Sequence, residues 1–281
     1  MIEAVGITKT FPVPDGQGGT TDKTVLQSVS LTIGDGAFVS LVGPTGCGKS
    51  TFLEILAGLQ TSSHGEVRIG GTPVLEPLSV TRDGMKGSRK KHRFLSPIAN
   101  SLFRNKPRHD MAMIFQDYAV FPWMTARQNV QFVLGLRGVP RREREELARH
   151  YLAMVGLEEA ADSYPSRMSG GMRQRLALAR AFSAEPRIIL MDEPFAAVDA
   201  LTREKLQDDL LHLWEKSGTT IVLATHDVGE AVCLSDEVFV LSQAPGTISE
   251  RVVIPLPRPR RHQAVAMQAL KERILSHFPV P

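Results

Sequence analysis

One glycine-rich octapeptide has residue types and a spacing suited to holding phosphate. It runs Gly43-Pro44-Thr45-Gly46-Cys47-Gly48-Lys49-Ser50 and matches the pattern G-x-x-x-x-G-K-[ST] in full. Its glycines let successive backbone N–H groups turn toward an anion, and a following helix start adds partial positive charge. We expect Lys49 to reach the β- and γ-phosphates and the Ser50 hydroxyl to bind Mg²⁺. The predicted nucleotide-binding residues are Gly43, Pro44, Thr45, Gly46, Cys47, Gly48, Lys49, Ser50 and Thr51.

The chain has two cysteines, Cys47 and Cys233, too few for the disulfide framework of a small secreted protein. A reducing compartment is the simpler prediction. We interpret Cys47 as a small residue tolerated in the glycine-rich loop rather than a redox switch. Because of its place in that loop, alkylation of its thiol is expected to block nucleotide binding.

A pair of carboxylates follows the apolar run Ile188–Met191, where Asp192 and Glu193 stand side by side. Ligands of α/β sheets bind at the carboxyl ends of the strands, so a strand neighbouring the glycine-rich loop would deliver both acids to the nucleotide. Asp192 is predicted to hold Mg²⁺, through water, and Glu193 to orient and polarise the attacking water. The alternative is a solvated acidic pair at a strand end, which the upstream phosphate loop disfavours.

A second candidate phosphate site is Ser169-Gly170-Gly171, at the start of a helix predicted to reach about Ala184. Ser169 is a good N-cap, which is its purely structural interpretation. Two consecutive glycines, however, cost a helix about 1 kcal/mol each relative to alanine. A close approach of the backbone to another group is expected to offset this cost, and a second phosphate is the obvious candidate.

The elements that must position these residues follow an α/β pattern. Alternating apolar residues in the N-terminal part predict antiparallel strands, and later runs that are apolar on both faces predict a mainly parallel, buried sheet. The predicted strands are Ile2–Ile7, Val25–Ile33, Ala37–Val42, Met111–Phe115, Arg187–Met191, Thr220–Ala224 and Val238–Leu241.

Helices are predicted at Lys49–Ala57 and, within a helical subdomain inserted into the core, at Ala126–Leu136 and from Pro140 onward. Two segments are expected to be irregular. Pro12–Asp22 is rich in glycine, proline, aspartate and threonine, and Glu76–Asp110 is long and strongly basic.

Ser169-Gly170-Gly171-Met172-Arg173-Gln174-Arg175 resembles the signature sequence of ATP-binding cassette (ABC) ATPases, and the resemblance spans nearly the entire chain. It implies the ABC ATPase fold, a RecA-like P-loop core with an antiparallel β subdomain and an inserted helical subdomain. It also implies a head-to-tail homodimer that hydrolyses ATP with Mg²⁺, each signature helix closing over the γ-phosphate held by the other subunit. The corresponding parts are 1–116 for the β subdomain and P-loop core, with a basic insertion at 76–110, 117–168 for the helical subdomain, 169–250 for the rest of the core and 251–281 for a C-terminal tail and helix.

The same resemblance assigns roles to four further residues. Gln116 matches the Q-loop glutamine that contacts Mg²⁺ and water, and His226 matches the switch histidine that contacts the γ-phosphate. Ala197-Val198-Asp199 resembles the D-loop at the dimer seam, which places Asp199 beside the nucleotide. Phe11 is the candidate for stacking on adenine, with an ordinary loop or core phenylalanine as its alternative.

In finer detail the chain is similar to the ATPase subunits of nitrate, sulfonate and taurine importers, in Phe121-Pro122-Trp123-Met124-Thr125 and Asp199-Ala200-Leu201-Thr202-Arg203 among other runs. This similarity implies integral membrane permease subunits as partners, fed by an extracytoplasmic solute-binding protein. It places the chain in the cytoplasm, peripheral on the inner face of the cell membrane. Phe121, Trp123 and Met124 would then contact the permease, or else be buried in the helical subdomain.

The bulk composition limits the other functions. The net charge is +3, from 33 basic and 30 acidic residues, so a basic coat for nucleic acid is not indicated and no nucleic-acid partner is expected. No apolar run approaches the length of a membrane span, and the N-terminus lacks signal-peptide features. Two rival functions remain, a soluble ABC protein that uses the basic segment 76–110 to contact nucleic acid or ribosomes, and a small-molecule kinase. A kinase would leave the signature and His226 unexplained. The basic segment could instead be a solvated insertion or contact anionic lipid headgroups.

Overall fold

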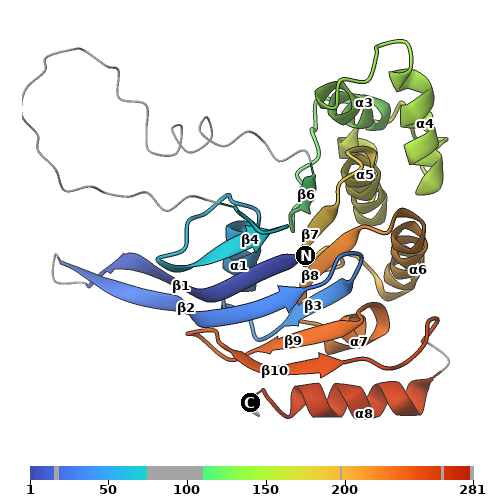
Figure 1. The fold of residues 1–281 in the computed structure, drawn as a ribbon. Coiled ribbons are helices and arrows are strands. Elements are labelled where there is room, and N and C mark those ends of the chain that lie inside the picture. Colours follow the sequence, from blue (N-terminus) through green and yellow to red (C-terminus); the bar gives the residue numbers. More distant parts are fainter. Residues whose placement is uncertain (16–18, 75–109, 197, 261–262, 279–281) are drawn as a thin grey trace, which may run out of the picture.

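The computed structural model describes residues 1–15, 19–74, 110–196, 198–260 and 263–278, which form two sheets with flanking helices (Figure 1). The four-stranded antiparallel sheet has the order β2-β1-β4-β5, and the six-stranded sheet has the order β10-β9-β3-β8-β7-β6. All strands of the second sheet are parallel except β10. The predicted α/β class, with N-terminal antiparallel strands and a mainly parallel central sheet, is therefore confirmed.

The strands are β1 (Ile2–Pro14), β2 (Thr20–Ile33), β3 (Phe38–Val42), β4 (His64–Ile69), β5 (Thr72–Pro73), β6 (Met111–Ile114), β7 (Ile188–Asp192), β8 (Thr220–Thr225), β9 (Glu237–Leu241) and β10 (Ile248–Val253). The α-helices are α1 (Lys49–Leu56), α3 (Ala126–Leu136), α4 (Arg144–Met154), α5 (Gly170–Ser183), α6 (Ala200–Ser217), α7 (Val228–Leu234) and α8 (Ala264–Leu275), and a 3₁₀ turn spans Pro165–Arg167.

Both faces of the parallel sheet are buried, as its continuous apolar strands predict. On β3, Val39 and Leu41 face a core shared with α1 and the four-stranded sheet. Phe38 and Val42 face the opposite core, which contains residues of α5, α6 and α7. Helix α1 and helix α5 therefore lie on opposite faces of the six-stranded sheet.

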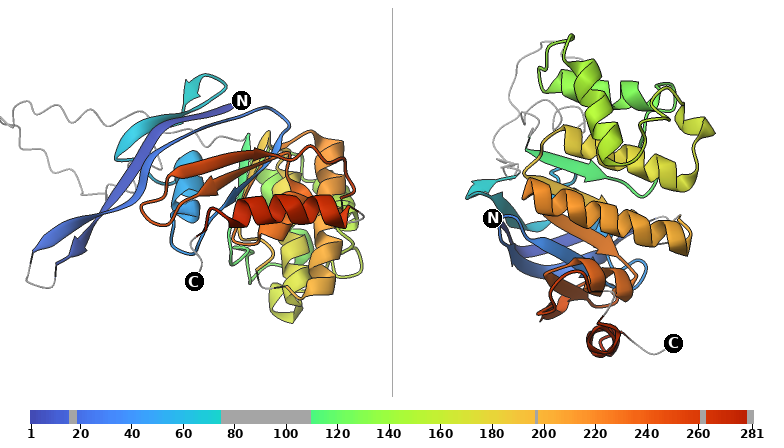
Figure 2. Two further views of the ribbon diagram at one scale, coloured as in Figure 1. Left: turned by 90° about the horizontal axis from the view of Figure 1, so that it is seen from below. Right: turned by 90° about the vertical axis from the view of Figure 1, so that its right-hand side faces the viewer.

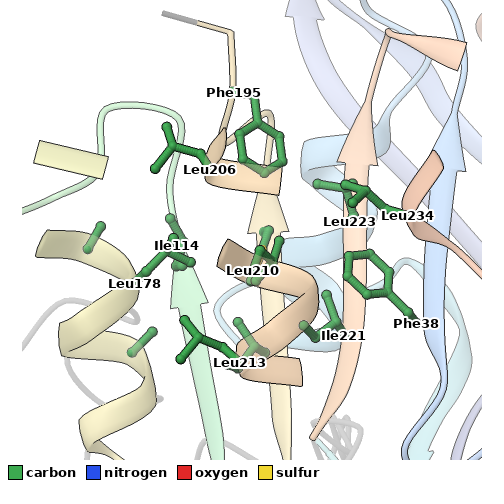
Figure 3. Packing of buried hydrophobic residues seen from close by; sticks show 14 of the residues in the cluster. Phe38, Ile114, Leu178, Phe195, Leu206, Leu210, Leu213, Ile221, Leu223 and Leu234 are labelled. Atoms are coloured by element: carbon green, nitrogen blue, oxygen red, sulfur yellow. The ribbon is translucent and has the colours of Figure 1, made fainter. Parts of the chain in front are cut away.

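Helix α6 shows how the second core is built. Leu206, Leu210 and Leu213 recur at helical spacing, and all three are buried in the core that also contains Phe195, Ile221 and Phe38 (Figure 3). Each such burial contributes about 1.5–3 kcal/mol of hydrophobic free energy. These side chains hold α6 against this face of the sheet.

The helices between residues 126 and 154 lie at one end of the molecule, and α8 lies at the other (Figures 1 and 2). A capping box starts α3, because Thr125 accepts from the Gln128 N–H while the Gln128 side chain accepts from the Thr125 N–H. Helix α4 begins at Arg144, not at Pro140 as predicted. Pro140 opens a turn instead, since its carbonyl accepts from the Glu143 N–H at 2.9 Å. The subdomain boundaries themselves stay a prediction.

The prediction that Pro12–Asp22 is an irregular loop was wrong for its two ends, since Pro12–Pro14 and Thr20–Asp22 lie in strands. Strands β1 and β2 continue as a hairpin that projects from the body, with Val13 paired to Thr21 and Pro14 to Thr20 (Figure 2, left). The prolines fit because the N–H of Thr10, two residues before Pro12, points away from β2 to the Ser63 hydroxyl. Pro12 and Pro14 share this orientation, so their missing N–H groups interrupt no bond to β2.

Residues 76–109 of the predicted basic insertion, and Ala197 of the predicted D-loop, lie outside the described residues. Within the part of the chain that is described, no helix has the length and apolar composition needed to cross a membrane.

Candidate functional site

The glycine-rich loop connects β3 to α1 in the conformation that its glycines allow. Gly46 and Gly48 have φ angles of 80° and 101°, in the left-handed region that favours glycine. A Cβ on Gly48 would also come within 2.6 Å of the Leu26 side chain. The loop thus packs tightly on β2 behind it, while Thr45 and Ser50 are exposed on its outer side. The exposed side is the one available to phosphate.

Two side chains of the loop point inward. Lys49 is buried, and its Nζ donates to the carbonyl oxygens of Gly43 at 2.8 Å and Pro44 at 3.2 Å, which holds the ammonium group over the loop. Cys47 is also buried, and burial raises the pKa of its thiol. This burial revises the expectation for alkylation. Modified Cys47 would still disrupt the loop, but the thiol is poorly accessible and poorly ionised.

Asp192 ends β7 and lies within hydrogen-bond reach of Ser50. Burial raises the pKa of its carboxyl, while the hydrogen bond from Ser50 and the charge of Lys49 act in the opposite direction. Its Oδ1 atom is buried without a hydrogen-bond partner among the described residues. A carboxylate oxygen left unpaired beside a hydroxyl is a donor set that fits Mg²⁺.

The strand that carries Asp192 does not neighbour the strand of the phosphate loop, contrary to prediction. Strand β8 lies between β3 and β7. The acid reaches the loop because α1 contacts both β7 and β8 across this face of the sheet. The carboxyl ends of all three strands still meet at one edge of the sheet, so the roles of Asp192 and Glu193 stay a prediction that this strand order allows.

Glu193 and His226 form a pair at this edge. They follow β7 and β8, which are adjacent and paired through Asp192 and Ala224. His226 Nδ1 lies 3.1 Å from Glu193 Oε2. Since an ionised carboxylate only accepts, the Nδ1 hydrogen is the donor, and Nε2 remains available on a ring that is 56% exposed.

The backbone at Glu193 is strained. Its φ angle is 44°, in the left-handed region that non-glycine residues seldom adopt, and its N–H donates to the Ala224 carbonyl at 2.9 Å. Such outliers persist only where the surroundings hold them, and they cluster at functional sites. The residue in this strained conformation is the one whose carboxylate contacts His226.

Gln116 lies in the turn after β6, the strand next to β7, and its side chain is exposed. It therefore occupies the same sheet edge as Asp192, and its contact with a metal stays a prediction. Phe11 lies on β1 paired with Lys23, and Lys9 Nζ sits 4.8 Å from the centre of its ring. The structure makes Phe11 a strand residue, and its adenine contact also stays a prediction.

The second phosphate candidate forms the N-terminus of α5. Ser169 is exposed, and its hydroxyl accepts from the Met172 N–H at 3.3 Å, so the predicted N-cap is confirmed. Gly171 has a packing role that the sequence did not suggest. A Cβ there would lie 2.7 Å from Thr202 Cγ2, so this glycine lets α5 and α6 approach closely. Gly170 is the partly exposed glycine of the two.

Asp199 caps α6, and its Oδ1 accepts from the Thr202 N–H at 3.0 Å. This backbone hydrogen bond lowers the pKa of the carboxyl. Asp199 is exposed. Four residues further along, Arg203 lines a cavity of about 40 Å³ together with Glu193, His226, Asp227 and Glu230. The sequence alone indicates no role for Arg203 or Glu230. The one signal for Arg203 is that it belongs to the run Asp199–Arg203, which is similar to importer ATPases.

Comparisons with known proteins show what the chain is similar to. Residues 26–196 match the family model described as ABC transporter. An uncharacterized ABC transporter ATP-binding protein of Methanocaldococcus jannaschii is 41% identical over 251 residues, which cover 89% of this chain and 83% of that protein. The bicarbonate transport ATP-binding protein CmpD of Synechococcus elongatus is 37% identical over 262 residues, which cover 92% of this chain and 82% of that protein. The dimeric post-hydrolysis state of the ATP-binding cassette MJ0796 bound to ADP and Pi gives a TM-score of 0.70 at 30% identity, covering 92% of this chain and all of that one.

Proposed function

The chain belongs to the ABC transporter family of ATP-binding cassettes, and from this premise we propose that Glu193 and His226 are the pair with which it hydrolyses ATP. The observation that carries the proposal is the 3.1 Å contact between their side chains at the ends of two adjacent strands. Glu193 orients and polarises the attacking water. His226 holds Glu193 through Nδ1 and presents Nε2 to the γ-phosphate.

The phosphate loop binds the rest of the nucleotide. Backbone N–H groups of the loop Gly43–Thr51, except at Pro44, and the ammonium group of Lys49 hold the phosphates, and Phe11 stacks on the adenine. Ser50, Asp192 and Gln116 would hold Mg²⁺, which when bound neutralises charge that develops on the phosphates. The unpaired Oδ1 of Asp192 supports this assignment. Catalysis then consists of positioning and electrostatic stabilisation.

The active unit proposed is a head-to-tail homodimer. Ser169, Gly170 and Gly171 of one copy would close over the γ-phosphate held by the other, and Asp199 would lie at the seam. Two observations support this arrangement. Ser169 and Asp199 are exposed at the starts of α5 and α6, and α5 lies on the face of the sheet opposite α1. The related cassette MJ0796 was solved as a dimer.

An exposed apolar surface on the helical part supports a permease partner. Trp123, Phe132 and Leu136 are 69%, 42% and 64% exposed, and Phe121 contacts both Trp123 and Phe132 with ring centres 5.6 and 5.0 Å apart. Aromatic side chains gathered in this way are typical of a protein interface. We propose that this surface receives a cytoplasmic helix of the permease, so that the chain works on the inner face of the membrane.

The proposed solute is a small anion or a sulfonate-like compound. The similarity to nitrate, sulfonate and taurine importers and the relation to CmpD, which is named for bicarbonate transport, support a solute with an anionic group. Solute recognition would lie in the permease and in its extracytoplasmic binding protein. Uptake of labelled bicarbonate, nitrate and taurine by proteoliposomes containing the co-purified complex, stimulated by loaded binding protein, tests the solute class.

Glu193→Gln tests the catalytic proposal directly. The variant should bind ATP with wild-type affinity, form an ATP-dependent dimer detectable by light scattering, and lose about a hundredfold or more in hydrolysis rate. Glu237→Gln, which alters an ion pair with Arg251 on the far strand β10, is the matched control and should leave the rate unchanged. Wild-type turnover in Glu193→Gln would reject the role of Glu193, and a variant that stays monomeric with ATP would reject the dimer.

A further inference from the structure

Arg203, in the first turn of α6, connects three functional segments that are distant in sequence. Its Nη2 donates to the carbonyl of Val198, in the predicted D-loop, at 3.0 Å. Its Nη1 lies 3.6 Å from Asp227 Oδ2, and its Nε lies 3.8 Å from Glu230 Oε1. Both carboxylates belong to the segment that follows His226. One guanidinium group thus spans the D-loop and the switch-histidine loop.

The carboxylates that face Arg203 are themselves fixed. Asp227 Oδ1 accepts from the backbone N–H groups of Gly229 and Glu230 and so caps α7. Glu230 is only 6% exposed, and its Oε2 accepts from the Thr225 hydroxyl at 2.8 Å. The charge of Arg203 is therefore directed at two fixed carboxyl groups at the start of α7, one of which is hydrogen-bonded to Thr225 at the end of β8. Geometry of this kind transmits displacement rather than absorbing it.

The same turn of α6 is locked to the signature helix. Thr202, the neighbour of Arg203, packs against Gly171 so closely that a Cβ on Gly171 would lie 2.7 Å from Thr202 Cγ2. A shift of α5 toward α6 would therefore displace Thr202 and with it the first turn of α6. Arg203 also lines the cavity of about 40 Å³ that Glu193 and His226 share, so the connection reaches the catalytic pair.

We propose that Arg203 is a positioning residue that couples two sites of the same chain. One site is Ser169–Gly171 with Asp199, which contacts the nucleotide bound by a second copy. The other is the Glu193–His226 pair, which acts on the nucleotide bound by the chain itself. This inference rests on the proposed function. Closure of the signature helix over one nucleotide is conveyed through Thr202 and Arg203 to the switch-histidine loop at the other. Without the guanidinium group, each half-site keeps its own residues but loses this connection.

The test compares Arg203→Met and Arg203→Lys with Arg251→Met in the full-length chain. Arg251 is a matched control, since it pairs with Glu237 on β9 and β10, away from the site. Arg203→Met should bind a fluorescent ATP analogue within about twofold of wild type, while its kcat falls about tenfold to a hundredfold and its Hill coefficient for ATP falls to about one. Arg203→Lys should retain part of kcat, because a cation still faces Asp227 and Glu230. Arg251→Met should behave as wild type.

Hydrogen exchange supplies a second readout that does not depend on turnover. Arg203→Met should speed amide exchange in two segments at once, 198–203 and 225–230, and Arg251→Met should do so in neither. Unchanged exchange in both segments, or a wild-type kcat and Hill coefficient in Arg203→Met, would overturn the inference. A wild-type chain that hydrolyses ATP without cooperativity would refute the proposed dimer instead, and the exchange data would still decide whether Arg203 joins the two loops.

Discussion

Gly246→Ala should weaken ATP binding although residue 246 is far from the phosphate loop in sequence. Gly246 lies in the turn between β9 and β10, where its N–H donates to the Val25 carbonyl at 2.8 Å and its carbonyl accepts from the Gln27 N–H at 2.9 Å. Real Cβ atoms essentially never come closer than 3.0 Å to another heavy atom of this kind. A Cβ at this position would be roughly 1 Å closer than that to the carbonyl oxygen of Cys47. The turn thus supports the back of the phosphate loop, and only glycine leaves room for it.

The expected loss follows from this overlap. Overpacking in a tight site costs about 1–3 kcal/mol. The two hydrogen bonds to β2 resist movement of the turn, so the phosphate loop is the part that must yield. If the whole cost appears as weaker nucleotide binding, the dissociation constant for ATP rises about 5-fold to 150-fold.

Equilibrium binding of a fluorescent ATP analogue to the purified chain measures this change. Gly34→Ala is the matched control, because Gly34 is exposed, a Cβ there would meet no atom within 4 Å, and its φ lies outside the left-handed range. Thermal unfolding of both variants separates a local shift of the loop from a general loss of fold. A folded Gly246→Ala chain whose affinity stays within about twofold of wild type would refute the reasoning.

Three further predictions concern buried groups. Burial raises the pKa of the Glu230 carboxyl from 4.5 to about 7, so the folded chain holds that proton more tightly than the unfolded chain and loses stability as pH rises through this window. Between about pH 5 and pH 8, Glu230→Gln should therefore gain roughly 2–3 kcal/mol of unfolding free energy relative to wild type in urea titrations; a constant difference would contradict this. Cys47 and Cys233 are both buried, so a chromogenic disulfide reagent should label neither in the native chain and both in denaturant, and rapid native labelling would exclude this packing. Arg260 Nη1 donates to carbonyl oxygens at the end of α7, so Arg260→Met should lower the unfolding free energy by about 3 kcal/mol or more, against under about 1 kcal/mol for Arg251→Met on the surface. Equal losses would contradict this assignment.

Features encoded by neighbouring residues could be predicted from the sequence. Lys49 and Ser50 sit where the glycine spacing places them, and Ser169 caps the helix that follows it. Asp192 and Glu193 end a strand whose apolar run is continuous. In each case the physical cause acts within a few residues, so the pattern alone contains it.

Features encoded by contacts between distant segments could not be predicted. The glycine-rich and proline-rich content of Pro12–Asp22 suggested a loop, but pairing between β1 and β2 overrides that local preference. The prolines are tolerated because β4 pairs with β1 only as far as Thr8, so among the described strands the other edge of β1 is unpaired beyond it. The placement of β8 between β3 and β7 is a property of topology. The sequence places Arg203 in a run similar to other ATPase subunits, but its contacts with Asp227 and Glu230 depend on how α6 packs.

The signature segment has two roles, packing against α6 and presenting a helix start to phosphate, and different residues serve them. Gly171 is buried against Thr202 and sets the distance between α5 and α6, whereas Ser169 is exposed at the helix start. The chain's own phosphate loop belongs to α1, on the opposite face of the parallel sheet. A rigid sheet with packed cores on both faces does not let one helix start swing round to the other face. If Ser169 meets a phosphate, that phosphate is therefore held by another molecule, and the buried glycine transmits the contact into α6 rather than making it.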